Sequence, residues 1–169
     1  MSTQREDIDV GFLSVTRKQM QNGEVRERVT FTDGTVVSRT TAALWLLEDG
    51  IPWQEAHYHV GLTESYVLVE GWAWFITCEG LCTKRDELVR PGETITFVPT
   101  VPHVVVLGPG AKIITTQFGE PVLNTEKSNR DWYPASEEIL PLLKEEKDIV
   151  EYLIRCSCSQ TEPAEVPVI

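Results

Sequence analysis

The sequence contains three histidines, and two of them, His57 and His59, are separated by a single residue. Successive side chains of a β-strand point to opposite faces, so this spacing places both imidazole rings on one face. Glu64 follows shortly after and adds a carboxylate. Three imidazoles, with His103 as the third, and one carboxylate suit iron, manganese, zinc, nickel or copper. We therefore expect one divalent transition metal per chain, bound by His57, His59, Glu64 and His103.

The third histidine, His103, follows a segment that contains Pro99 and Pro102. Proline fixes its own φ, so this segment gives His103 a rigid backbone and a defined side-chain direction. A centre with three or four protein ligands leaves exchangeable positions for water or substrate. Where a reaction needs an acid or a base beside the substrate, Glu64 and Tyr66 are the catalytic candidates.

Short segments with strand character, separated by turn residues, surround the candidate ligands. Asp33-Gly34 and Pro91-Gly92 are typical of tight turns. Regularly spaced short strands predict an all-β barrel or sandwich. The expected strands cover residues 25–31, 41–48, 53–60, 65–69, 72–78, 83–89, 94–98, 103–107 and 112–118, with a further strand paired to 25–31 after the turn at Gly34.

Alternation along these strands predicts which side chains share the interior with the ligands. The parity of Glu64 and His103 gives a largely apolar lining of Tyr66, Leu68, Val105 and Leu107. Gln117 has the parity of Thr115 and Ile113, which makes it a candidate polar contact, with a surface position as an equal alternative. Large aromatic residues in strands usually belong to the core. We interpret four tryptophans in this way, with stacking against a bound ring or sugar as the alternative: Trp45, Trp53, Trp72 and Trp74.

The segment HYHVGLTESYVLVEG, from His57 to Gly71, resembles the first motif of the cupin superfamily. The second motif of that family begins at a Gly and places its His eleven residues later, an offset that Gly92 and His103 keep. The resemblance covers residues 43–118 and implies a cupin-type β-barrel, a double-stranded β-helix or jelly roll, with the four ligands inside. Thr100 stands where the family usually has a Gly, and Leu107 replaces its closing Asn.

The chain has one expected domain with additions at both ends. Residues 1–24 form an N-terminal arm without a clear period, and residues 25–133 form the barrel. Capping-box spacing between Asp148 and Glu151, with a break at Pro141, predicts short C-terminal helices over 134–155 that pack on the barrel. Residues 156–169 are expected to be a flexible tail.

Charge and composition limit the partners. Acidic residues outnumber basic ones by 26 to 15, and the net charge of −11 repels phosphate backbones and anionic lipid surfaces. We expect a small-molecule partner, with neither nucleic acid nor membrane. The N-terminus lacks the apolar core of a signal peptide, which indicates a cytoplasmic location. The cupin resemblance implies a homodimer that pairs N-terminal arms.

Basic residues and cysteines give further expectations. No cluster of Arg or Lys falls beside the ligands in the sequence, which argues against a phosphorylated substrate. The cysteine pairs lack the two-residue gap of zinc knuckles, so a structural zinc or disulfide is not expected. Four basic residues are expected on the solvated surface: Arg39, Lys84, Arg85 and Arg90.

The pattern favours a metal-dependent enzyme that acts on a small molecule. The sparse set of acid–base groups favours dioxygenase-type chemistry, in which the metal activates oxygen and substrate. A metal-dependent isomerase, epimerase or lyase that acts on a sugar or carbonyl compound is the alternative. A non-catalytic cupin that binds a ligand, or whose metal stabilises the barrel, is the third hypothesis.

Overall fold

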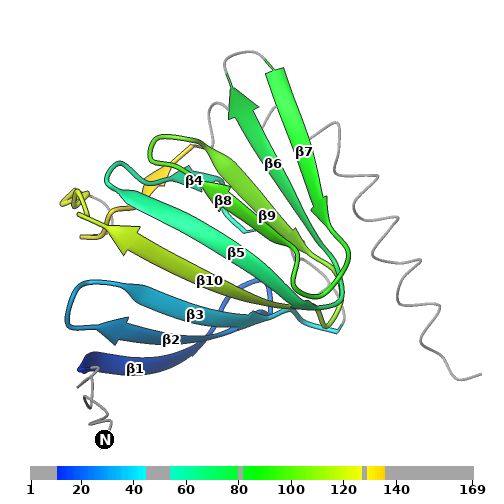
Figure 1. The fold of residues 1–169 in the computed structure, drawn as a ribbon, viewed down its shortest axis with the longest axis horizontal. Coiled ribbons are helices and arrows are strands. Elements are labelled where there is room, and N and C mark those ends of the chain that lie inside the picture. Colours follow the sequence, from blue (N-terminus) through cyan, green and yellow to red (C-terminus); the bar gives the residue numbers. More distant parts are fainter. Residues whose placement is uncertain (1–10, 45–53, 80–81, 127–128, 136–169) are drawn as a thin grey trace, which may run out of the picture.

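The structure, a computed structural model, describes residues 11–44, 54–79, 82–126 and 129–135 (Figure 1). Every regular element within these ranges is a β-strand, and the strands form two antiparallel sheets. No helix among the described residues has the length and apolar character needed to cross a membrane. The all-β jelly-roll expectation is therefore confirmed. Of the segment 134–155 in which C-terminal helices are expected, Pro134 belongs to a strand, and residues 136–155 lie outside the described residues.

The larger sheet has six strands in the order β1-β2-β3-β10-β5-β8. The long pairing of β10 with β5 joins the N-terminal strands to the middle of the chain. The bounds are β1 (Phe12–Gln19), β2 (Val25–Phe31), β3 (Val36–Thr41), β5 (Leu62–Glu70), β8 (Thr94–Phe97) and β10 (Lys112–Gly119).

The smaller sheet has five strands in the order β11-β4-β9-β6-β7. Its outer hairpin, β6 and β7, lies at the opposite side of the molecule from β1–β3 (Figure 1). The bounds are β4 (His57–Tyr58), β6 (Ala73–Glu79), β7 (Cys82–Leu88), β9 (His103–Leu107) and β11 (Tyr133–Pro134).

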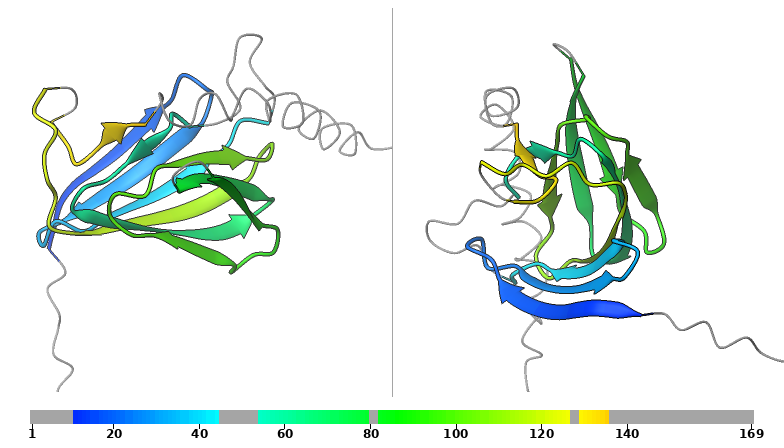
Figure 2. Two further views of the ribbon diagram at one scale, coloured as in Figure 1. Left: turned by 90° about the horizontal axis from the view of Figure 1, so that it is seen from above. Right: turned by 90° about the vertical axis from the view of Figure 1, so that its left-hand side faces the viewer.

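The two sheets face each other (Figure 2), and strands of both contribute residues to the hydrophobic core. β5 contributes Tyr66 and Leu68 to the core, and β9 contributes Val105 and Leu107. These are the residues predicted to face inward because they alternate in step with Glu64 and His103. Phe75 on β6 completes this layer. Trp74 lies on the opposite face of β6 and is also buried, as expected for a core residue. Trp74 packs under the guanidinium of Arg85.

Most strands agree with the sequence patterns, and three segments differ. The strand expected over 53–60 is reduced to His57–Tyr58. β3 ends at Thr41, and the region 45–53 lies outside the described residues, together with Trp45 and Trp53. The segment before Val25 contains β1, which pairs with β2 along its length. Most side chains of this edge strand are exposed, so its sequence carries no clear apolar alternation.

Candidate metal centre

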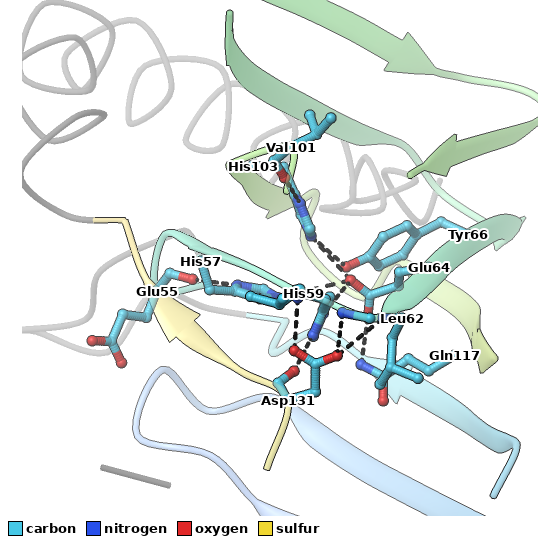
Figure 3. Close-up of polar contacts among 12 residues, drawn as sticks. Glu55, His57, His59, Leu62, Glu64, Tyr66, Val101, His103, Gln117 and Asp131 are labelled. Carbon is cyan, nitrogen blue, oxygen red and sulfur yellow. Dashed lines mark hydrogen bonds and ion pairs between the residues drawn. The ribbon is translucent and has the colours of Figure 1, made fainter. Parts of the chain in front are cut away.

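The four predicted ligands meet inside the barrel. His57 lies on β4 and His59 just beyond it, Glu64 on β5 and His103 on β9, and β4 and β9 pair at His57 and His103. All four residues are buried, with exposed fractions of 1% to 7%. One ligand atom from each residue lies within 4.8 Å of those of the others. The motif spacing therefore does bring the four side chains together (Figure 3).

One carboxylate oxygen is the point on which the three rings converge. Glu64 Oε2 lies 3.0 Å from Nε2 of His103, 3.2 Å from Nε2 of His59 and 3.8 Å from Nε2 of His57. The other oxygen, Oε1, accepts a hydrogen bond of 2.8 Å from Nε2 of Gln117. Gln117 thus contacts the centre directly, and the surface alternative is wrong. The amide fixes the carboxylate so that Oε2 faces the rings.

Each imidazole is also fixed through its second nitrogen. Nδ1 of His57 lies 2.8 Å from the carbonyl oxygen of Glu55, and Nδ1 of His103 lies 3.0 Å from that of Val101. Nδ1 of His59 bonds the carbonyl oxygen of Asp131. A carbonyl oxygen only accepts, so each Nδ1 must carry the proton. In the neutral ring, Nε2 then carries a lone pair that is available to bind a metal.

These tautomers create an electrostatic conflict that a cation resolves. Three Nε2 lone pairs face a carboxylate oxygen, which is also an acceptor. Burial lowers the pKa of His57, so protonating that ring is costly. A divalent metal between these atoms would satisfy all four donors, and nitrogen and carboxylate ligands suit such an ion.

Asp131 supports this cluster, and the sequence analysis did not identify it. Its carboxylate is buried and accepts four backbone N–H groups, those of Val60, Gly61, Leu62 and Val122, at 2.7 to 3.2 Å. The first three belong to the segment between His59 and Glu64, so Asp131 sets the direction in which that segment carries both ligands. It lies outside both motifs and in no periodic segment, so no local pattern marked it.

Tyr66 lies beside the centre, as its parity predicts. Its hydroxyl is 3.4 Å from Nε2 of His103. Burial, followed by the negative charge of Glu64, raises the pKa of Tyr66 well above its usual value. The phenol therefore stays protonated at neutral pH, so it is suited to donate a hydrogen bond and poorly suited to act as a base.

Two aromatic side chains outside the sequence prediction cover the imidazoles. Phe97 stacks on His103 with ring centroids 4.4 Å apart and planes inclined by 8°. Trp132 stacks on His57 at 5.8 Å. These rings restrict the imidazoles and exclude water from one side of each.

Thr100 adopts a left-handed backbone conformation at the position where the resemblance implies a Gly. Its φ is 71°, in the left-handed region that is more favourable for Gly than for Thr. Its backbone N–H donates a 2.6 Å hydrogen bond to the carbonyl oxygen of His59. This hydrogen bond connects the segment before His103 to a ligand of the centre.

No protein-family model and no curated protein sequence matches the chain. Solved structures of Bacillus subtilis oxalate decarboxylase are similar to it. A mutant of that enzyme gives a TM-score of 0.54 at 14% identity, covering 73% of this chain and 31% of that one. A structure from a study of its Mn(II) centres gives 0.53 at 15% identity, with the same coverage. The enzyme at pH 4.6 gives 0.53 at 14% identity, covering 73% and 30%. The chain thus spans about a third of the oxalate decarboxylase chain, and it has the cupin fold.

Proposed function

We propose that this protein is a metal-dependent enzyme that acts on a small molecule through a centre of three histidines and one glutamate. The observation that carries the proposal is the set of three Nδ1–H bonds to the backbone carbonyls of Glu55, Val101 and Asp131. They fix three Nε2 lone pairs toward one point, an arrangement whose electrostatic cost a bound cation removes.

A divalent metal at this point would supply open positions for a substrate and, if it is redox-active, for oxygen activation. The side chains of the centre would perform the remaining tasks. Glu64, held by Gln117, would serve as the anionic ligand, and Tyr66 would donate a hydrogen bond to a substrate oxygen. Phe97 and Trp132 would keep water from the ligand rings.

Dioxygenase-type chemistry fits this inventory better than isomerisation. An isomerase or epimerase needs a base that removes a proton from carbon. Glu64 is occupied by the three rings and by Gln117, and Tyr66 stays protonated because its pKa is raised. We therefore favour an oxygen-dependent reaction, with lyase or isomerase chemistry as the alternative outcome of its test.

The test is oxygen uptake by metal-loaded protein. Chelator-treated protein is loaded anaerobically with Fe(II), Mn(II) or Zn(II), and oxygen consumption is followed with a panel of small 2-oxo and 2-hydroxy carboxylic acids. Substrate-dependent uptake that requires iron and is lost in His103→Ala supports the proposal. Product formation without oxygen uptake would assign the centre to a lyase or isomerase, and bound metal without any turnover would leave a binding protein.

The homodimer remains a prediction. It is supported by β1, an edge strand whose Leu13 and Val15 are 69% and 64% exposed. Light scattering across a wide concentration range should give twice the chain mass, and a constant monomer mass would contradict the dimer.

A further inference from the structure

Two arginines on β2, Arg26 and Arg28, point into the barrel. In the pairing of β2 with β3, Arg28 lies opposite Ser38 and Arg26 lies opposite Thr40. Ser38 and Thr40 are both buried. Because paired residues of adjacent strands project to the same face of a sheet, the two arginines share the inner face with these hydroxyls.

The row of residues that contains Arg28 continues to the metal centre. Ser38 pairs with Thr115 on β10, and Thr115 pairs with Tyr66 on β5. Thr115 and Tyr66 are also buried, so the row remains on the inner face. Three strand spacings of about 4.8 Å separate the backbones of Arg28 and Tyr66. A long arginine side chain and a small bound molecule together span this distance.

The guanidinium of Arg26 is incompletely satisfied among the described residues, and that of Arg28 has a long hydrogen bond. Nε of Arg26 is buried and has no hydrogen-bond partner there. Nη2 of Arg26 lies 3.6 Å from Oε2 of Glu24, and Nε of Arg28 donates a long bond of 3.3 Å to Oγ of Ser38. A buried donor without a partner is unfavourable, and a bound anion would supply the missing acceptors.

A charge interaction connects Arg28 with the centre. Burial, followed by the positive charges of Arg26 and Arg130, lowers the pKa of Arg28, and the Glu64 carboxylate opposes that change. Arg28 therefore interacts electrostatically with Glu64, although no basic cluster adjoins the ligands in the sequence.

We propose that Arg26 and Arg28 bind the carboxylate group of a small acid whose other polar atoms reach the metal centre. This inference rests on the proposed function, because the centre holds the second end of the ligand. The planar fork of a guanidinium matches a carboxylate in bidentate geometry. The buried carboxylates of Glu24 and Glu64 repel a multiply charged phosphate more strongly than a singly charged carboxylate, so a carboxylate is the favoured anion.

The test measures binding to manganese-loaded protein by calorimetry. The probes are pyruvate and glycolate, with pyruvamide as the uncharged counterpart of pyruvate and inorganic phosphate as the competing anion. The variants are Arg28→Met and Arg28→Lys, the latter keeping the charge without the fork. Arg39→Met is the matched control, because Arg39 lies on the outer face of β3, where it is exposed and paired with Glu27. Elemental analysis gives the metal content of every sample.

The expected result is a loss of about tenfold to hundredfold in pyruvate or glycolate affinity in Arg28→Met, and a smaller loss in Arg28→Lys. Arg39→Met should change affinity by less than about twofold, and pyruvamide binding should not respond to Arg28→Met.

Equal effects of Arg28→Met and Arg39→Met would overturn the inference. The same holds if metal-loaded protein binds neither acid, or binds phosphate more tightly than both acids through Arg28. These outcomes leave the metal centre intact, whereas wild-type protein that takes up no manganese would overturn the proposed function as well.

Discussion

The two polar regions of the barrel interior differ in how well their groups are satisfied. At the metal centre, every imidazole has a carbonyl partner for Nδ1, and Oε1 of Glu64 accepts a hydrogen bond from Gln117, so only the atoms that would bind the ion face one another. On β2, Arg26 has a buried Nε without a partner among the described residues, and Arg28 has one long hydrogen bond. The side chains of the metal centre are thus positioned before an ion binds. The two arginines would obtain a further acceptor from the anionic group of a bound ligand.

This difference has an energetic consequence. Hydrogen bonds that position the metal ligands also connect distant segments, so they contribute to folding as well as to binding. The arginines contribute little to folding, since half-buried charge with poor partners yields little net stability. Substitutions in the two regions should therefore separate stability from ligand binding.

The largest effect is expected for Asp131→Ala. It would leave four backbone N–H groups without their acceptor and release the segment that carries His59 and Glu64. We expect a loss of about 3 kcal/mol in the free energy of unfolding, measured by urea denaturation. Metal affinity should fall by about tenfold to hundredfold.

Asp33→Ala is the matched control for Asp131→Ala. Asp33 accepts one backbone N–H, that of Thr35, in an exposed turn. Its loss should cost about 1 kcal/mol or less. Equal destabilisation by the two variants would contradict the role assigned to Asp131.

A smaller effect is expected for Gln117→Leu, which removes one hydrogen bond to Glu64. The carboxylate would lose its fixed orientation, and metal affinity should fall by about tenfold in a competition assay with a chelating dye. The cost in unfolding free energy should be about 1 kcal/mol. Unchanged metal affinity would show that the three rings alone orient Glu64.

The smallest effect on stability is expected for Arg28→Met. The variant removes a half-buried charge and one long hydrogen bond to Ser38, so the free energy of unfolding should change by less than about 1 kcal/mol. Urea denaturation of the metal-loaded protein measures this change. A loss as large as that of Asp131→Ala would show that the arginines hold the barrel together, and the contrast between the two regions would fail.

The two regions also differ in how far they could be predicted from the sequence. His57, His59, Glu64 and His103 could be predicted because metal-binding residue types occur at spacings that strand alternation places on one face. Turn residues such as Gly34 and Gly92 likewise separated the strands, and both adopt positive φ. These are local signals, and the structure agrees with them.

Asp131 and the arginine pair depend instead on long-range arrangement. Asp131 bonds to the backbone of residues about seventy positions earlier in the chain. Arg28 faces the centre only because the registers of β2, β3, β10 and β5 place it in one row with Tyr66. A single sequence does not specify register between distant strands. The surface expectation did hold for Arg39, which is exposed on the outer face of the same sheet.

The most direct test of the metal centre is elemental analysis of protein purified without chelators and without a histidine tag, before and after loading with excess Mn(II), Fe(II) or Zn(II). The account predicts about one divalent metal per chain, because the four ligands form a single site. A variant with His57→Ala and His59→Ala should retain almost none after desalting. A metal-free wild-type protein after loading, or equal metal content in the variant, would contradict the account.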